Sequence, residues 1–444
     1  MSIIGIYSSS EAREGILRRI PWEDQEMPEQ VLDGIERIFG ERVPPADAVA
    51  RILRDVRGRG DAALREWSAR IDGVTAPELE VPAVAWRAAY ENLTIVERSA
   101  LDLAAERIES FHRQQPVDSW VVSSPEGMLG QLIRPLDSTG VYVPGGSAPL
   151  PSSLLMAAIP ARVAGVRTVN VCTPPGRGGN VPGLTLAAAH VGRVDRLFVL
   201  GGAQAIAAMA YGSETVPAVD KIVGAGGLFV TLAKRQVIGT VGIDGFYGPT
   251  ETMLIADDTA DPSWAAADLL AQAEHDVLAT PILIATSRRL AEAVAAQVAA
   301  QLGSLSRAEI AAASLAGRGG IVLAADLSEA VELANSFAPE HLCLLVSDPW
   351  ALVGQIRNAG GIFVGEHSFE VLGDYVAGPS HVMPTEGSAR YASPLSVTDF
   401  VKRISLVGLT AHAGTRLSGP ASVLARGEGL TAHASAAEMR MGGK

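Results

Sequence analysis

Four histidines of this chain stand close to carboxylate or amide side chains, and these are the places where the sequence could carry chemistry. Gln272 and His275 are three residues apart and therefore share one face at the end of a predicted helix. Glu340 and His341 are adjacent and lead into an apolar run. Two further stretches each combine an acid with an imidazole: Asp374 with His381, and Glu428 with His433.

This set of side chains favours a zinc site. Imidazole nitrogen with amide or carboxylate oxygen suits Zn²⁺, and a site with an open position suits catalysis. The chain has no HExxH motif, so a protease-type zinc site has no support. Spacing leaves open whether Gln272 or Glu274 is the ligand. Taken singly, each histidine has a structural role as its ordinary alternative, and that role is predicted for His112, His190, His367 and His412.

Composition excludes several classes of protein. A net charge of −13 argues against a nucleic-acid partner, which requires a basic face. Neither a secretory leader nor an uninterrupted apolar stretch of membrane-spanning length is evident. Cys172 and Cys343 each lie within an apolar run and are predicted to be buried thiols, which rules out a disulfide framework and a Cys-rich metal site. We therefore expect a cytoplasmic protein without a membrane partner.

The elements that must position these residues follow from hydrophobic periodicity. Residues 47–70 and 83–113 have the spacing of amphipathic helices, with a turn at 58–60. Beyond residue 139, short β-branched runs alternate with helical patterns, which predicts βαβ units and parallel sheets. The predicted strands of a first sheet are 140–143, 168–172 and 197–200. Those of a second sheet are 252–256, 282–285, 321–324, 342–346 and 361–364, with helices at 264–274, 288–302, 327–336 and 349–359.

The predicted fold class is α/β, with two Rossmann-like parallel-sheet domains and small N- and C-terminal helical arms. We expect ligands at the carboxyl ends of the strands in both sheets, as in other open α/β sheets. The predicted division is an N-terminal arm at 1–30; a first α/β domain of 31–138 with 250–390, carrying the zinc and catalytic motifs; a second, NAD-binding α/β domain at 139–249; and a small C-terminal domain at 391–444.

Seven ordered motifs resemble the histidinol dehydrogenase family, over roughly residues 45 to 440. They are Gly-Val-Tyr-Val-Pro-Gly-Gly (140–146), Gly-Gly-Ala-Gln-Ala (201–205), Leu-Leu-Ala-Gln-Ala-Glu-His (269–275), Ala-Pro-Glu-His-Leu (338–342), Gly-Asp-Tyr-Val-Ala-Gly (373–378), His-Val-Met-Pro-Thr (381–385) and Leu-Thr-Ala-His (430–433).

The resemblance implies one zinc per subunit, held by Gln272, His275, Asp374 and His433. It assigns catalysis to Glu340 and His341, for which the structural alternative is a helix C-terminal cap. It also implies that the C-terminal segment crosses to the active site of another subunit, which predicts an intertwined homodimer. The residues implied to bind substrate are Thr250, Gln272, His275, His341, Asp374, His381, Glu428 and His433.

Binding of NAD is implied by Tyr142 and Gln204, which match the family. The third family position is an Asn that ends a Gly-Pro-Gly-Asn loop, and here the loop reads Gly224-Ala225-Gly226-Gly227. Gly227 offers no amide, so we expect weaker NAD binding, by several-fold to about tenfold for one lost hydrogen bond. Loss of the proline is also expected to relax the loop.

The implied activity is zinc-dependent oxidation of the small molecule L-histidinol to L-histidine through histidinal with two NAD⁺, in histidine biosynthesis. Two departures from the family pattern, Tyr247–Thr250 and Pro379–Ser380, lie where the family lines its substrate pocket. One alternative is therefore a paralogue that oxidises another hydroxymethyl compound such as sulfopropanediol, for which Arg390 is a candidate sulfonate partner. The other is a non-catalytic regulatory relative, supported only by the altered Gly-rich loop.

Overall fold

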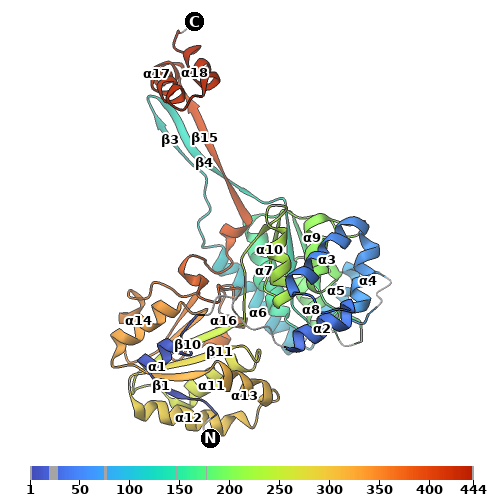
Figure 1. Cartoon of the computed structure of the whole chain (residues 1–444), viewed down its shortest axis with the longest axis vertical. Helices are drawn as coiled ribbons and strands as arrows, with labels where there is room; N and C mark the ends of the chain where they lie inside the picture. Colours follow the sequence, from blue (N-terminus) through green and yellow to red (C-terminus); the bar gives the residue numbers. More distant parts are fainter. Residues whose placement is uncertain (1–2, 20–28, 75–77, 146–148, 177, 443–444) are drawn as a thin grey trace. The chain divides into compact units, whose positions relative to one another are not determined.

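The computed structural model describes residues 3–19, 29–74, 78–145, 149–176 and 178–442 (Figure 1). The chain forms two compact units. Unit 1 comprises Met1–Gln115 and Asp137–Phe400, and unit 2 comprises Pro116–Leu136 and Val401–Lys444. Among the described residues, unit 1 holds two six-stranded sheets and unit 2 holds a three-stranded sheet.

The first sheet has the Rossmann-like order 3-2-1-4-5 with one added edge strand. Its spatial order is β2 (Glu80–Val81), β7 (Arg196–Val199), β6 (Thr168–Thr173), β5 (Ser138–Tyr142), β8 (Lys221–Val223) and β9 (Gly242–Ile243). All neighbours are parallel except β2, which runs antiparallel to β7. Because both faces are covered by helices, every residue of β5, β6 and β7 after the first is buried.

Helices from both the N-terminal third and the βα connections cover the first sheet. One face packs against α3 (Pro45–Arg59), α4 (Asp61–Ile71), α9 (Gly202–Tyr211) and α10 (Leu228–Val237). A further group packs together as α5 (Ala83–Glu91), α6 (Ile95–His112), α7 (Pro151–Ala164) and α8 (Gly183–Val191). Helix α2 (Glu29–Phe39) contacts α3.

The second sheet is entirely parallel and repeats the same order with its own added edge strand. Its order is β1 (Ile6–Ser8), β12 (Gly320–Leu323), β11 (Thr280–Ala285), β10 (Glu251–Ala256), β13 (His341–Leu345) and β14 (Gly361–Val364). The predicted strands of both sheets are confirmed to within two residues at each end. The buried cysteines are confirmed as well, in β6 and β13.

Alternate residues of the second sheet feed two separate hydrophobic cores, as the two-residue repeat of a strand requires. Leu254, Leu283 and Cys343 face one core, whereas Met253, Ile282 and Leu342 face the other. The first core is closed by α11 (Pro262–Ala273), α12 (Arg288–Leu302) and α13 (Ala308–Gly317), and the second by α1 (Ser9–Glu14), α14 (Leu327–Phe337) and α15 (Trp350–Val353) (Figure 1). The chain then continues through α16 (Glu370–Tyr375) and the 3₁₀ turns Ser388–Arg390 and Val397–Phe400.

Unit 2 is an antiparallel ribbon followed by two helices. Strand β4 (Gly127–Pro135) pairs with β3 (Trp120–Ser124) on one side and with β15 (Val401–Leu409) on the other. Helices α17 (Ala411–Gly427) and α18 (Thr431–Glu438) pack against each other. The last fifty residues therefore contain a long strand that hydrophobic periodicity did not predict.

The packing corrects the predicted domain division. Residues of α3 and α4, assigned with 31–138 to the zinc-carrying domain, share the core of the first sheet, and β2 extends that sheet. The N-terminal stretch 6–8 is a strand of the second sheet and not a separate arm. The β3–β4 hairpin joins the C-terminal residues. An amphipathic pattern shows that a helix has a buried face but does not show which sheet it covers.

No described helix is long and apolar enough to cross a membrane.

Candidate active site

The predicted catalytic residues gather at the amino ends of strands in the second sheet. Thr250 precedes β10, Glu340 precedes β13 and His341 begins it, and Thr252 and His341 are register neighbours. These residues therefore lie at the strand ends opposite to those where the general rule for open α/β sheets predicts ligands. That rule reflects phosphate binding at the helix N-termini found there, which acid–base residues do not need.

His341 is held in one tautomer by its backbone partner. Its Nδ1 lies 3.1 Å from the carbonyl oxygen of Glu251, and because a carbonyl only accepts, Nδ1 must carry the proton. Its Nε2 then bears a free lone pair. That atom is buried without a hydrogen-bond partner among the described residues and lies 3.9 Å from Asp374 Oδ1. His341 thus presents an unprotonated nitrogen able to accept a proton.

Glu340 is a buried carboxyl group with two donors on one oxygen. Its Oε2 accepts the Thr250 hydroxyl at 2.6 Å and the backbone N–H of Glu251 at 3.0 Å. Burial raises the pKa of Glu340 to about 7 and outweighs His341 and these donors, which lower it. A carboxyl that titrates near neutral pH is suited to act as a general base.

Glu251, on which both residues depend, is itself paired. Its carboxylate accepts hydrogen bonds from both terminal nitrogens of Arg19, with Nη2 2.8 Å from Oε2. The Arg19 guanidinium also donates to the Phe337 carbonyl oxygen. Arg19 is therefore already neutralised. Arg390, the candidate sulfonate partner, donates from Nε to the Gly387 carbonyl at 3.1 Å.

Gln272 lies in the last turn of α11 and is completely buried. Its Oε1 lies 3.3 Å from the Thr252 hydroxyl, and its Nε2 has no partner among the described residues. His275 follows the end of the helix, and its backbone N–H bonds to the carbonyl oxygen of Gln272 at 3.2 Å. The predicted face shared by Gln272 and His275 thus lies at the carboxyl end of α11.

Asp374 belongs to α16, which contacts α11. The Asp374 carbonyl is hydrogen-bonded by His381 Nδ1 at 2.9 Å, and His381 Nε2 accepts from the Ser153 hydroxyl at 3.1 Å. Burial lowers the pKa of His381, which keeps it neutral. Both ring nitrogens are thus used within the chain, so His381 fixes the segment that carries Asp374.

Zinc can be tested against these donors. A buried Gln272 amide end without a partner, the His275 imidazole and the Asp374 carboxylate offer nitrogen and oxygen ligands of the kind that Zn²⁺ takes. Within the described part of the chain, no three His, Cys, Asp or Glu side chains form a ready-made metal site. The predicted ligand set is not of this kind, because Gln272 supplies an amide and His433 belongs to unit 2. By the chemistry of their donor atoms, Gln272, His275 and Asp374 fit the metal.

The predicted NAD residues lie at the carboxyl edge of the first sheet, as expected. Tyr142 ends β5, and its hydroxyl accepts the Gly202 N–H at 3.1 Å; burial raises the pKa of Tyr142 to about 12. Gln204 Nε2 donates to Asp72 Oδ2 at 3.3 Å, and its buried Oε1 has no partner among the described residues. Burial raises the pKa of Asp72 to about 6. Gly146 of the first motif lies outside the described residues.

Two buried side chains hold the first residue of the Gly224–Gly227 loop, in contrast to the expected relaxation of this loop. The Gly224 N–H donates to Asp244 Oδ2 at 2.6 Å, and its carbonyl accepts from Lys234 Nζ at 3.0 Å. Lys234 and Asp244 form a fully buried ion pair with each other. Gly224 has φ of +110°, and a Cβ there would lie 2.2 Å from the Tyr142 carbonyl oxygen, so only glycine fits.

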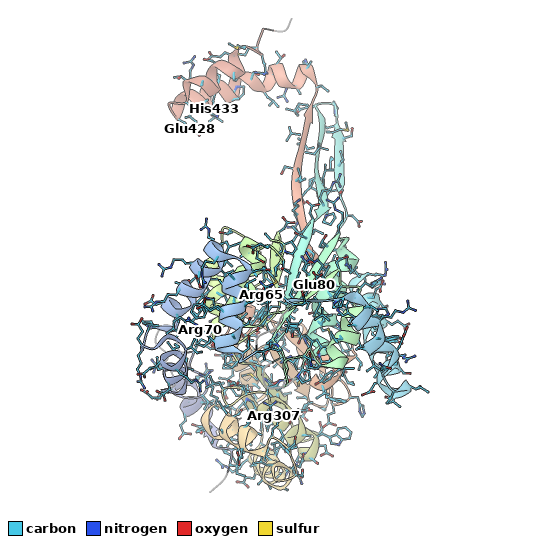
Figure 2. The ribbon with its side chains drawn as sticks, turned by 90° about the vertical axis from the view of Figure 1, so that its right-hand side faces the viewer. Arg65, Arg70, Glu80, Arg307, Glu428 and His433 are labelled. Carbon is cyan, nitrogen blue, oxygen red and sulfur yellow. The ribbon has the colours of Figure 1, made fainter. Side chains whose placement is uncertain are left out.

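Glu428 and His433 belong to unit 2. Glu428 follows α17, and His433 lies in the first turn of α18 (Figure 2). Both are exposed at the same end of the helical pair.

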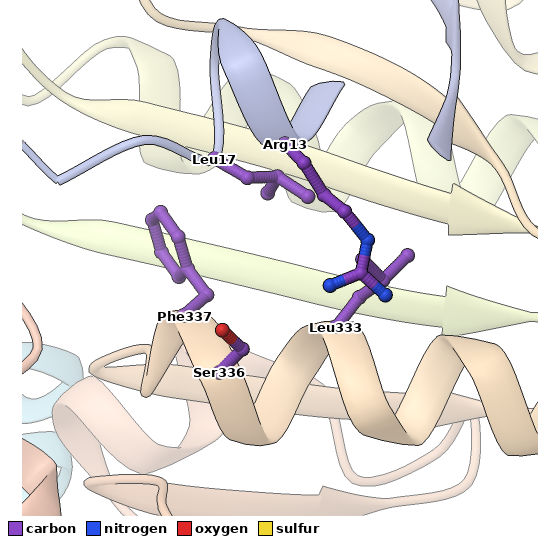
Figure 3. Close-up of a pocket in the computed structure, with 5 residues that line it drawn as sticks. All are labelled: Arg13, Leu17, Leu333, Ser336 and Phe337. Atoms are coloured by element: carbon purple, nitrogen blue, oxygen red, sulfur yellow. The ribbon is translucent and has the colours of Figure 1, made fainter. Parts of the chain in front are cut away.

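A separate pocket of about 150 Å³ lies between the α1 segment and α14 (Figure 3). It is lined by Arg13, Leu17, Leu333, Ser336 and Phe337 and includes none of the predicted site residues.

The sequence analysis missed three polar residues that touch the predicted ones: Thr252, Glu370 and Asp72. Thr252 and Glu370 are hydrogen-bonded to each other under the Gln272 amide. Burial and the charge of Asp374 raise the pKa of Glu370 well above its ordinary value. A carboxylate beside the apolar residues of Phe-Glu-Val-Leu could have indicated a buried polar group, whereas a threonine within a β-branched strand gives no such signal.

Two parallel sheets of Rossmann-like order, with a buried Glu-His pair beside amide, imidazole and carboxylate donors, define an α/β enzyme of the dehydrogenase class.

The sequence profile described as histidinol dehydrogenase matches residues 42–441. The chain is 52% identical to the histidinol dehydrogenase of Deinococcus radiodurans, over 98% of this chain and 99% of that protein. It is 53% identical to that of Thermus thermophilus over 89% of this chain and 95% of that protein. The crystal structure of histidinol dehydrogenase from Elizabethkingia anophelis superposes with a TM-score of 0.90 at 31% identity, covering 99% of this chain and 98% of that one. The chain belongs to the histidinol dehydrogenase family and is an oxidoreductase.

Proposed function

We propose that this enzyme oxidises L-histidinol to L-histidine in two successive steps, with two NAD⁺ and one zinc per subunit. The observation that carries the proposal is His341, whose Nδ1 is fixed by a backbone carbonyl and whose free, buried Nε2 lies 3.9 Å from Asp374 Oδ1. The buried Glu340 carboxyl lies on the other side of the ring, with its Oε2 3.7 Å from Nδ1. The reaction consumes one water and converts a hydroxymethyl group to a carboxylate.

The residues proposed to hold zinc are Gln272, His275, Asp374 and His433. When bound, zinc supplies a Lewis acid that binds and orients the amino alcohol, and NAD⁺ supplies the hydride acceptor. Tyr142 and Gln204 would hold the cofactor, and Thr250 and Glu428 would complete the proposed substrate contacts. His381 would join them by exchanging the Ser153 hydroxyl at its Nε2 for the substrate. Because Gln204 Oε1 is buried and unpaired, a donor of the cofactor can satisfy it.

In the first oxidation, His341 Nε2 accepts the hydroxyl proton of the substrate as the alcohol carbon gives up hydride, which produces the aldehyde. In the second, the ionised Glu340 carboxylate takes a proton from water as the water adds to the aldehyde carbon, and the protonated His341 returns its proton to the aldehyde oxygen, which gives the hydrate. His341 Nε2 then accepts a hydroxyl proton from the hydrate as the carbon gives up hydride to the second NAD⁺, and the product is the carboxylate. One base near neutral pH can serve both steps.

A homodimer with an exchanged C-terminal segment is also proposed. The ribbon of unit 2 leaves large apolar side chains exposed, and β3 is exposed along its whole length. An exposed apolar ribbon of this kind is stabilised when a partner covers it. A second copy of the chain is the partner that the zinc proposal requires. The exposed apolar side chains of the ribbon include Trp120, Val122, Leu129 and Val407, and α17 adds Val423 and Leu424.

We place the enzyme in the cytoplasm and in histidine biosynthesis. Two buried free thiols are consistent with a reducing compartment. The net charge of −13 gives no support to a nucleic-acid partner.

A steady-state assay tests the proposed function. NADH formation is measured with L-histidinol and, separately, with sulfopropanediol, before and after dialysis against a chelator. We expect two NADH per histidinol, loss of activity with the chelator and recovery with Zn²⁺. Turnover of sulfopropanediol alone would assign the enzyme to the paralogue, and turnover of neither compound would support a non-catalytic relative. The pairing of Arg19 with the Glu251 carboxylate favours histidinol, because this guanidinium is already neutralised, whereas Arg390 is bonded only through its Nε to a backbone carbonyl.

A further inference from the structure

Beneath the proposed metal ligands, three buried polar side chains from three elements form a hydrogen-bonded row. Gln272 comes from α11, Thr252 from β10 and Glu370 from α16. Each is at most 2% exposed. The Thr252 hydroxyl lies 3.3 Å from Gln272 Oε1 and is also closely bonded to Glu370 Oε2. None of the residues in this row except Gln272 has a role in the proposed reaction.

The hydroxyl of Thr252 has a single proton, and this limits the hydrogen bonds that the row can form. A hydroxyl donates one hydrogen bond, so Thr252 cannot donate to Glu370 and to the Gln272 oxygen together. Because Thr252 donates to Glu370, it offers Gln272 only lone pairs. Those lone pairs can accept a hydrogen bond from the amide nitrogen of Gln272 but not from its oxygen. Oxygen and nitrogen of a glutamine amide are placed by their hydrogen bonds, and a half-turn of the amide exchanges them.

After that half-turn the Gln272 nitrogen donates to Thr252, and the amide oxygen occupies the buried position that has no partner. An amide oxygen can coordinate a cation, whereas an amide nitrogen cannot. The row and the metal therefore favour the same amide orientation.

We infer that Thr252 and Glu370 are positioning residues that aim the Gln272 carbonyl oxygen at the metal. This inference rests on the proposed function, in which Gln272 is a zinc ligand. Outer partners that orient a metal ligand commonly contribute 10- to 100-fold to metal affinity.

The test measures zinc affinity of the full-length enzyme by competition with a chromophoric chelator. Thr252→Val keeps the branched shape and removes the hydroxyl, and Glu370→Gln removes the charged acceptor. We expect each to weaken zinc binding by about 10- to 100-fold. Thr252→Ser is the matched control, because it keeps the hydroxyl and should stay close to wild type. The visible spectrum of the Co²⁺-substituted protein gives a second readout, since it changes when a ligand is lost.

Coupling separates positioning from a general loss of stability. In a Gln272→Ala background, Thr252→Val should no longer lower zinc affinity, because there is no amide left to orient. Unchanged affinity and an unchanged Co²⁺ spectrum in Thr252→Val and Glu370→Gln would overturn the inference while the proposed function stands. An equal loss of affinity with and without Gln272 would also overturn it. If the wild-type enzyme binds no zinc, the proposed function fails, and this inference fails with it.

Discussion

At the scale of single residues, the candidate site depends on two buried groups in different protonation states. His341 has its proton on Nδ1, where the Glu251 carbonyl accepts the hydrogen bond, and this leaves the Nε2 lone pair free to accept a proton. Glu340 instead reaches a pKa of about 7 through burial. The carboxyl and the imidazole are thus both usable as bases near neutral pH, although their ordinary pKa values differ.

Replacing His341 tests its proposed role as the proton acceptor. We expect His341→Asn to lower kcat by about 10²- to 10⁴-fold, the usual contribution of a general base. Zinc content, measured by atomic absorption, should remain at the wild-type level because His341 is not a proposed ligand. Retention of more than a tenth of wild-type kcat would remove His341 from the reaction.

The raised pKa of Glu340 predicts a pH dependence of the second oxidation. With the aldehyde as substrate, the rate should fall about tenfold per pH unit below pH 7, as the carboxyl becomes protonated and cannot activate water. Glu340→Gln should abolish this limb and leave a low, pH-independent rate. A wild-type profile that is flat between pH 6 and 8 would contradict the assignment.

The raised pKa of Glu340 also makes the stability of the folded chain depend on pH. Because burial raises the folded-state pKa from its ordinary value of 4.5 to about 7, the neutral carboxyl is the form that folding favours. Its contribution to stability is complete below the ordinary pKa and is lost as the pH rises through 7. Activity and this contribution to stability therefore change in opposite directions with pH.

At the scale of elements, the Gly224–Gly227 loop connects β8 to α10, and its glycine-rich sequence gives it no rigidity of its own. Its first residue is pinned at both N–H and carbonyl by the buried Asp244 and Lys234. Its last residue, Gly227, has extended backbone, and a Cβ there meets no atom within 4 Å. The loop is thus fixed at one end and open to a side chain at the other.

Restoring the missing amide should strengthen cofactor binding. We expect Gly227→Asn to lower the Kd for NAD⁺ by several-fold to about tenfold, the effect of one neutral hydrogen bond. Gly227→Ala is the control, because it adds a Cβ without an amide and should leave the Kd unchanged. Titration of NAD⁺ by calorimetry gives both values. Equal Kd values for the two variants would show that position 227 does not reach the cofactor.

The ion pair beneath the loop predicts a change in stability. Lys234→Met leaves the Asp244 carboxylate buried without its cation, which should cost about 3–5 kcal/mol of unfolding free energy. Adding Asp244→Asn to this variant should recover part of the loss, because the remaining partner is then neutral. Urea denaturation measures both variants. A loss below about 1 kcal/mol in Lys234→Met would mean that Asp244 is solvated or neutral in the folded chain.

At the scale of the whole molecule, the proposed active site combines residues of unit 1 with Glu428 and His433 of unit 2 from a second copy of the chain. Each subunit alone would then lack one proposed zinc ligand. The C-terminal segment and the β3–β4 hairpin fold together as one unit. Oligomerisation would therefore be a condition for activity, beyond any effect on stability.

Mixing two inactive variants tests this arrangement. His433→Ala removes a ligand given to the partner, and His341→Asn removes the base of its own subunit. After joint unfolding and refolding, a hybrid dimer should regain one intact site, so an equimolar mixture should recover about a quarter of wild-type activity. Each variant refolded alone is the control. A mixture as inactive as its components would show that both residues serve the same subunit's site.

Sequence alone determined the local elements and indicated the candidate reactive groups. Apolar runs such as 252–256 and 342–346 identified buried parallel strands, and the ordered motifs indicated the Glu340–His341 pair and the proposed zinc donors. These features depend on residue type and spacing over a few turns, which the sequence shows directly. Tertiary structure decided which sheet α3 and α4 cover, that β15 pairs with β4, and that the site lies at the amino ends of the second sheet's strands. It also decided that His341 Nε2 is free and that Thr252 and Glu370 lie under Gln272. The two hydrogen bonds of Thr252 join residues 20 and 118 positions apart, and the β15–β4 pairing joins residues still farther apart. Such contacts result from the packing of whole elements against one another, which no local pattern specifies.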